Sequence, residues 1–205
     1  MDTTPETKRE RRLAARAERQ RLAEEGRRRA RQRRRLTLGG LVLVAVAVVV
    51  AGIYFIGQTA LQPSPGRTLP DEGRTHVNAG EPIQYQNNPP ASGPHYPIWT
   101  RPGVYTDPQD KGYWVHSLEH GYVVILYNCP SGCPDLVQQL RQFYEAAPKS
   151  SRYGYQKLVI TPYTEMSHPI ALLAWDHIEE MDQFSADEAL TFYKAYLDKG
   201  PEDAP

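Results

Sequence analysis

Histidine and glutamate side chains gather in two short motifs in the C-terminal half of the chain. His95 ends the string Ser-Gly-Pro-His, and His116, Glu119 and His120 fall within the five residues His-Ser-Leu-Glu-His. On a helix His116 and His120 would share a face and could bind one metal ion, whereas in an extended chain they would stand about 13 Å apart. Imidazole nitrogen is a common ligand of zinc and copper. We therefore predict that His95, His116 and His120 bind a metal ion.

Two other interpretations of these motifs stay open. A histidine taken alone is more typical of a buried, hydrogen-bonded structural role. The string His116-x-x-Glu119-His120 also matches the reversed zinc-protease pattern. That pattern requires a long helix and a further acidic ligand downstream, and neither is evident, since Gly121 is a natural helix end before a strand. We assign no catalytic residues, and the sequence leans towards a binding protein rather than an enzyme.

Cys129 and Cys133, the only cysteines, fall between a predicted buried strand and a predicted helix. They could form a structural disulfide, a redox pair whose thiol pKa is lowered by the helix N-terminus, or a metal site. Three intervening residues, one more than in Cys-x-x-Cys, weaken the redox interpretation. As a metal site, the cysteines would join Met166 and His168 in a second candidate ligand set. Its sulfur atoms favour Cu⁺, so we expect copper first and zinc second.

The elements that would position these residues alternate between strands and helices. Runs of β-branched and aromatic residues indicate strands, an apolar period of 3.6 indicates a helix, and a capping box from Ser185 to Glu188 opens a last helix. A helix between the first two strands permits a parallel crossover, and a short later link suggests a hairpin. We therefore predict a three-layer α/β domain with a mixed sheet. The predicted strands are 121–127, 157–161, 170–175 and about 177–181, and the predicted helices are 135–147 and 185–199.

The start of the chain differs from the rest in charge and hydropathy. Residues 1–35 carry 14 basic and 6 acidic residues, a net charge of +8, and the remaining 10 basic and 18 acidic residues give −8. Residues 36–57 are almost wholly apolar, and about 20 helical residues span the hydrocarbon core of a bilayer. We predict one transmembrane helix here rather than a cleaved signal peptide, because the basic flank is long and no clear cleavage site follows.

We expect the chain to divide into four parts. The cluster Arg27–Arg35 precedes the apolar segment, so the positive-inside rule puts a basic tail (1–35) in the cytoplasm and everything after the transmembrane helix (36–57) outside. Prolines and glycines mark a linker at 58–75, and the domain occupies 76–205. This predicts a single-pass protein of the cell membrane, whose partners are the bilayer and anionic lipid at the Arg cluster rather than nucleic acid.

The order strand, cysteine turn, helix and strand, followed by His168-Pro169, a strand and a terminal helix, resembles thioredoxin-like domains. In those domains a cis-proline faces the cysteine turn, and Pro169 stands at the corresponding place. The string Cys129-Pro-Ser-Gly-Cys133-Pro is similar to that of the Sco copper-chaperone family. Proteins of that family are tethered by one membrane helix and bind copper through both cysteines and a distal histidine. The resemblance implies metal delivery or homeostasis, with a metal-receiving membrane protein as partner.

Three further strings resemble a bacterial family, domain of unknown function 3105. They are Asn-Pro-Pro-x-Ser-Gly-Pro-His at 88–95, His-Ser-Leu-Glu-His-Gly-Tyr-Val-Val at 116–124 and Ala-Leu-Leu-Ala-Trp at 171–175. The resemblance covers about residues 75–202. It implies a membrane-anchored domain outside the cytoplasm and supplies no activity or site residues.

Two functional alternatives remain beside metal binding. A non-catalytic interaction module would use the cysteines as a staple and the histidines as loop-fixing hydrogen-bonding groups. A thiol–disulfide exchange protein would need an exposed Cys129 with a depressed thiol pKa. Dinucleotide, phosphate-loop and Gly-x-Ser-x-Gly motifs are missing from the sequence, which removes the enzyme classes that depend on them.

Overall fold

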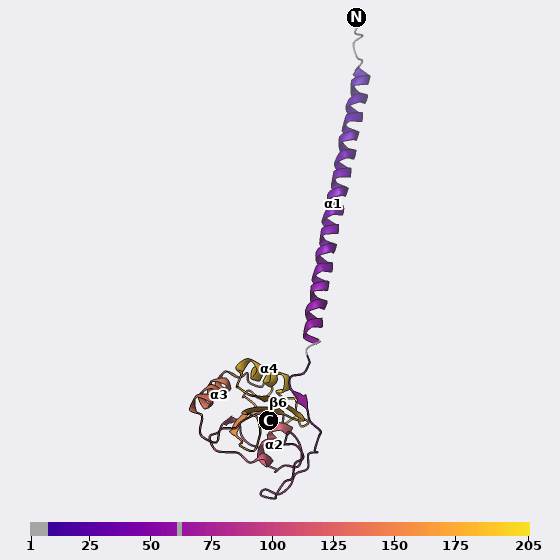
Figure 1. Cartoon of the computed structure of the whole chain (residues 1–205). Helices are drawn as coiled ribbons and strands as arrows, with labels where there is room; N and C mark the ends of the chain where they lie inside the picture. The colour runs from indigo at the N-terminus through magenta and orange to yellow at the C-terminus, as the bar shows by residue number, and fades with distance from the viewer. Residues whose placement is uncertain (1–7, 61–62) are drawn as a thin grey trace. The chain divides into compact units, whose positions relative to one another are not determined.

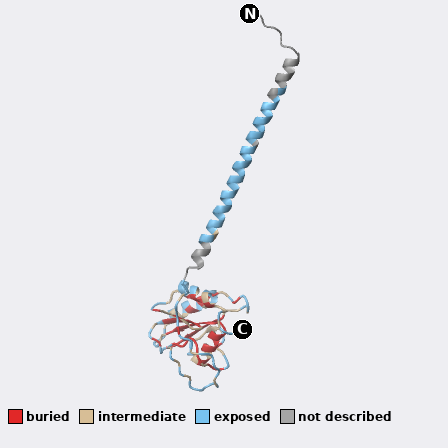
Figure 2. Ribbon diagram, turned by 90° about the vertical axis from the view of Figure 1, so that its right-hand side faces the viewer, coloured by how far each residue is buried: buried red, intermediate tan, exposed pale blue. Residues whose placement is uncertain are grey.

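The computed structural model describes residues 8–60 and 63–205, which form two compact units divided between residues 62 and 63. In the first unit a single helix, α1, runs over Lys8–Ala60 (Figure 1). Its Arg19–Tyr54 part holds a stretch long and apolar enough to cross a membrane. The large apolar side chains of this stretch, such as Leu41 and Leu43, are exposed. Figure 2 shows the pale blue of exposed residues along most of the helix. The first unit therefore contains one candidate transmembrane helix near the N-terminus.

The second unit is built on a six-stranded mixed sheet with the strand order β1-β6-β5-β3-β4-β2. The pairs β3–β4 and β2–β4 are parallel, whereas β3–β5, β5–β6 and β1–β6 are antiparallel. The predicted mixed sheet, with a parallel crossover and a later hairpin, is thereby confirmed. The strands are β1 (Arg67–Thr68), β2 (Gly103–Val104), β3 (Val123–Tyr127), β4 (Leu158–Pro162), β5 (Ile170–Ala174) and β6 (His177–Met181).

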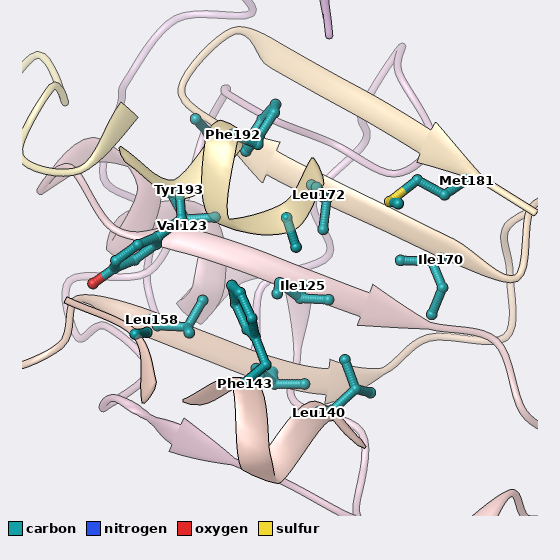
Figure 3. Close-up of a cluster of buried hydrophobic side chains, with 14 of the residues drawn as sticks. Val123, Ile125, Leu140, Phe143, Leu158, Ile170, Leu172, Met181, Phe192 and Tyr193 are labelled. Atoms are coloured by element: carbon teal, nitrogen blue, oxygen red, sulfur yellow. The ribbon is translucent and has the colours of Figure 1, made fainter. Parts of the chain in front are cut away.

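Helices cover both faces of this sheet. Successive side chains of a strand point to opposite faces, so Val123 and Ile125 of β3 join one core cluster and Val124 and Leu126 join the other. Figure 3 shows the first cluster, where Leu140 and the aromatic rings of the helices meet the strands. Fully burying a Leu or Ile side chain contributes about 1.5–3 kcal/mol. The first face is covered by α3 (Pro134–Ala146) and α4 (Ala186–Tyr196), and the second by α2 (Lys111–Glu119) together with loop segments.

The ends of the elements follow local sequence signals. Pro134 occupies the first turn of α3, where a missing N–H costs little. Ser185 is the N-cap of α4, and its Oγ accepts a hydrogen bond from the backbone N–H of Glu188 at 3.4 Å. This confirms the capping interaction expected at Ser185. The last helix ends at Tyr196, three residues before Lys199 where we expected it to stop.

Part of the segment assigned to the linker contributes to the folded unit. Arg67 pairs with Ile178 of β6, and its guanidinium forms an ion pair with Glu180 at 2.9 Å. Leu69 is buried, and its N–H donates to the carbonyl of Asp176 at 2.7 Å. A pairing of two residues leaves no periodic pattern in a stretch rich in proline and glycine. Residues 63–75 are therefore part of the compact unit that carries the site.

The cis-proline implied by the thioredoxin-like resemblance is not at Pro169. Among residues 8–60 and 63–205 the cis peptide bond is Asn88-Pro89, in the proline-rich loop before α2. The bond that precedes Pro169 is trans. The resemblance was therefore wrong in this detail, although the strand that follows Pro169 is present as β5.

Candidate metal centre

The last turn of α2 carries three of the candidate side chains. Asp110 caps the start of this helix by accepting a hydrogen bond from the Gly112 N–H at 2.7 Å. The helix ends at Glu119, with His120 as its C-cap, and His116, Glu119 and His120 are all buried. Because the segment is helical, the Nε2 atoms of His116 and His120 lie 3.0 Å apart. The short helix considered in the sequence analysis is present.

A loop brings two more histidines to the same place. The N–H of Tyr96 donates to the carbonyl of Gly112 at 3.0 Å, which fixes the segment beside α2. His76 and His95 form an isolated parallel β-bridge, with the His95 N–H donating to the Thr75 carbonyl at 3.0 Å. The ring centroids of His76 and His95 are 4.8 Å apart, and each lies within 4.9 Å of the His116 ring. Three imidazoles from distant parts of the chain thus meet.

Backbone carbonyls fix the tautomers of two of these rings. Nδ1 of His95 lies 2.8 Å from the carbonyl oxygen of Gly93, and Nδ1 of His116 lies 2.6 Å from that of Tyr96. A carbonyl oxygen can only accept, so Nδ1 carries the hydrogen in both rings. In the neutral rings Nε2 then offers a lone pair to the centre. This is the arrangement in which an outer hydrogen bond orients a metal-binding histidine.

The carboxylate of Glu119 faces these lone pairs. Its Oε2 lies 3.0 Å from Nε2 of His95 and 3.9 Å from Nε2 of His76. An ionised carboxylate and an imidazole lone pair are both acceptors, so a contact of 3.0 Å requires a proton or a cation between them. His95 is fully buried and Glu119 nearly so, which makes an uncompensated charge there costly.

The donor atoms fall into two overlapping sets. The first set is His76, His95, His116 and Glu119, and the second set is His116, Glu119, His120 and Glu202; within each, the donor atoms lie within 4.8 Å of one another. Ligands of a tetrahedral metal ion lie about 2.0–2.2 Å from it, so the donor atoms stand about 3.3–3.6 Å from one another. Donor pairs as far apart as 4.8 Å would have to close by about 1 Å, and the pairs at 3.0 Å would have to open slightly, before either set coordinates an ion.

Glu202 reaches the centre from the C-terminal segment. Its Oε2 lies 3.6 Å from Nε2 of His120, and its backbone N–H donates to the carbonyl of Glu119 at 3.0 Å. The structure thus places an acidic side chain from 82 positions beyond His120 beside the His-x-x-Glu-His motif. Glu202 could not be predicted, because its segment has neither periodicity nor a motif. His76 was missed for the same reason.

Burial sets the protonation of these groups. It lowers the pKa values of His95, His116 and His120, which favours the neutral, metal-binding rings. Burial also raises the pKa of Glu119, and the nearby carboxylate of Glu202 adds to this rise. Nδ1 of His120 is buried and has no hydrogen-bond partner among the described residues, and the nearby Pro205 backbone acts against the lowering of the His120 pKa. The metal-free centre thus disfavours charge of either sign.

We expect the metal-free protein to lose stability as the pH falls below about 6.5, the ordinary histidine pKa. Below it the unfolded chain binds protons that the folded chain, with lowered pKa values at His95, His116 and His120, does not. The raised pKa of Glu119 acts in the opposite direction. As the pH falls, the folded chain binds a proton at this carboxyl before the unfolded chain does, which stabilises the folded chain. We expect the combined effect of the three histidines on the free energy of unfolding to exceed that of the single carboxyl. Urea unfolding with chelator present should give a lower midpoint at pH 5.5 than at pH 7.5, and a smaller difference in His95→Gln. Equal midpoints at the two pH values would contradict the expectation.

The other candidate ligands lie elsewhere. Cys129 and Cys133 are joined by a disulfide, so the disulfide interpretation is confirmed and neither sulfur is a thiolate ligand in this state. Both pack against the core cluster under α3 and α4. Met166 is buried in the opposite cluster, and His168 is half-exposed with its Nδ1 3.4 Å from Asp182. The structure does not bring these four residues together with His95, His116 and His120.

Trp99 lies between the histidine rings of the centre and a cavity lined by aromatic residues. Its ring lies 4.8 Å from that of His120 and 5.7 Å from that of His116, centroid to centroid. The same indole lines a cavity of about 550 Å³ together with Tyr122 and Tyr155. The hydroxyl groups of these two tyrosines are 3.2 Å apart. Trp99 was not among the site residues predicted from the sequence.

The sequence of the folded unit matches one family of proteins. The family model described as "Protein of unknown function (DUF3105)" matches residues 76–205, and the chain belongs to this family. The resemblance inferred from the strings at 88–95, 116–124 and 171–175 is thereby confirmed. Neither the curated proteins nor the solved structures contain a match to the chain.

Proposed function

We propose that the domain binds a divalent transition-metal ion through His76, His95, His116 and Glu119. The observation that carries the proposal is the contact of His95 Nε2 with Glu119 Oε2 at 3.0 Å inside the protein. Because His95 Nδ1 is bonded to a carbonyl, this contact joins two acceptors unless a cation or a proton lies between them. Three imidazoles and one carboxylate are a sufficient ligand set for a four-coordinate ion.

The donor types bear on which ion is bound. Nitrogen and oxygen ligands suit Zn²⁺ and Cu²⁺, whereas Cu⁺ prefers sulfur. Of the sulfur atoms on which the expectation of Cu⁺ rested, those of Cys129 and Cys133 are joined in a disulfide, and that of Met166 belongs to a buried side chain of the second core cluster. Copper therefore remains a candidate as Cu²⁺, with Zn²⁺ as its competitor. We propose metal holding or delivery at a membrane as the role.

The anchored location belongs to the same proposal. The apolar stretch of α1 would cross the bilayer, and the cluster Arg27–Arg35 would hold the N-terminus in the cytoplasm, where it would also attract anionic lipid. The disulfide Cys129–Cys133 favours an oxidising compartment for the domain. A metal-receiving membrane protein would be the natural partner of such a carrier.

A thioredoxin-like core is part of the proposal as well. Its support is the connectivity β3-α3-β4-β5-β6-α4, in which β3 and β4 are parallel and the β5–β6 hairpin is antiparallel. The cysteine pair lies between β3 and α3, as in the domains it resembles. The proposed metal site does not depend on this assignment.

Metal titration of the full-length chain in detergent micelles tests the function. Chelator-stripped protein should take up Zn²⁺ or Cu²⁺, and its unfolding temperature should rise, because an ion that binds only the folded state stabilises it by about 4 kcal/mol at a thousand times its dissociation constant. Uptake is measured by elemental analysis after gel filtration. Protein that retains neither ion and shows no thermal shift would favour the non-catalytic interaction module instead.

A further inference from the structure

The geometry points to a second metal ion beside the first, bound by His120 and Glu202 and bridged to the first ion by Glu119. This inference rests on the proposed function, because it adds an ion to the same centre. The donor atoms of the second set lie within 4.8 Å of one another. The Nε2 of His120 is 3.6 Å from Glu202 Oε2. Nitrogen and oxygen donors at these separations suit the same divalent ions as the first set.

The shared members of the two sets can be divided so that two ions are bound at once. His116 offers only Nε2, since its Nδ1 is bonded to the carbonyl of Tyr96 at 2.6 Å, so it serves one ion. Glu119 is a carboxylate with two oxygen atoms and can bind two ions at once. Assigning His116 to the first ion leaves Glu119, His120 and Glu202 for the second. Paired metal ions bridged in this way stand about 3.5–4 Å apart.

The C-terminal segment is held so that Glu202 stays at the centre. Lys157 is buried, and its Nζ donates to the carbonyl oxygens of His120 at 2.8 Å and Ala204 at 2.6 Å. Asp203 forms an ion pair with Arg152 and accepts a hydrogen bond from Tyr153 at 2.7 Å. The Glu202 side chain itself makes no hydrogen bond among the described residues and is about half exposed. Its backbone is fixed while its carboxylate is left for a ligand.

The second ion would keep an open coordination position. Three protein ligands are one fewer than the four of a closed structural site, and catalytic zinc sites leave the fourth position to water or substrate. Each set has three buried members and one exposed member, His76 in the first and Glu202 in the second. Because the first ion has one more protein ligand, it would be held more firmly, and the second would exchange with solution and could bind a water molecule or a small anionic ligand.

Counting zinc ions in two variants tests the second site. Full-length protein in micelles is stripped with chelator, loaded with excess Zn²⁺, passed through gel filtration and analysed for zinc per chain. We expect about two ions in the unmodified chain and about one in Glu202→Gln. The control, Glu145→Gln, removes an exposed carboxylate on α3 and should keep both.

Each outcome decides a different point. One ion in the unmodified chain would overturn the second site and leave the proposed function standing, whereas no ion would overturn both. Two ions in Glu202→Gln would overturn the assignment of Glu202. A second readout uses Cu²⁺: ions about 3.5–4 Å apart couple magnetically and weaken the paramagnetic resonance signal per copper. In Glu202→Gln the signal should return to that of an isolated ion.

Discussion

Substituting His116 by alanine should abolish tight binding of the first metal ion by the full-length chain. His116 belongs to both donor sets, and its Nε2 lies 3.0 Å from that of His120. Loss of an outer partner of a metal ligand already costs 10–100-fold in affinity, so loss of the ligand itself should cost more than about 100-fold. Isothermal titration with Zn²⁺ and with Cu²⁺ measures the change.

Two further variants control for misfolding of the chain and for metal binding at its surface. Glu119→Gln keeps the volume of the side chain and removes its charge, and it should also weaken binding. His168→Ala removes a half-exposed histidine that lies beside Asp182, outside both sets, and should bind as the unmodified chain does. If His116→Ala kept its affinity while His168→Ala lost it, the ion would lie near the cysteine turn and our assignment would be wrong.

Substituting Lys157 by methionine should destabilise the domain by about 3–5 kcal/mol, the usual effect of removing one partner of a buried charged pair. Its Nζ lies 3.2 Å from Asp198 Oδ1 and donates to two carbonyl groups, and its side chain is 1 % exposed. Methionine fills the space but removes the donor that faces Asp198 Oδ1 and both carbonyl oxygens, while Ser150 still donates to the other carboxylate oxygen. Since a domain is stabilised by only about 5–15 kcal/mol in total, the effect should be large.

Urea unfolding at pH 7.5 of the metal-free protein measures this change. The matched control is Lys149→Met, which removes an exposed lysine from the same chain and should change stability by less than about 0.5 kcal/mol. Lys157→Met should also free the segment that carries Glu202, because one of the lost hydrogen bonds goes to Ala204. Equal unfolding midpoints for the two variants would show that the buried ammonium is not needed.

Local patterns were enough to predict the central elements of the fold. The β-branched run that became β3, the apolar period of α3 and the capping box at Ser185 each carry their signal within a few residues. The two-residue strands β1 and β2 lack such a signal, because they exist only through pairing with β6 and β4. Sequence reasoning therefore recovered the core of the sheet and missed its edges.

The same distinction explains the ligand sets. His116 and His120 are related by helical spacing, which is visible in the sequence, whereas His76 and Glu202 arrive through long-range contacts that no spacing encodes. The cysteines were grouped with the histidines by type alone. His120 precedes β3 and Cys129 follows it, and a five-residue strand is about 17 Å long, so the two groups lie at opposite ends of the strand.

The position of two of the three tryptophans gives the domain an optical property. Trp99 packs against His116 and His120, and the Trp175 ring is 6.3 Å from that of His95. An open-shell ion such as Cu²⁺ held among these imidazoles would quench the fluorescence of either indole, whereas closed-shell Zn²⁺ would leave the emission nearly unchanged. The unlabelled domain thus carries its own fluorophores, which report the electronic character of whatever ion it holds.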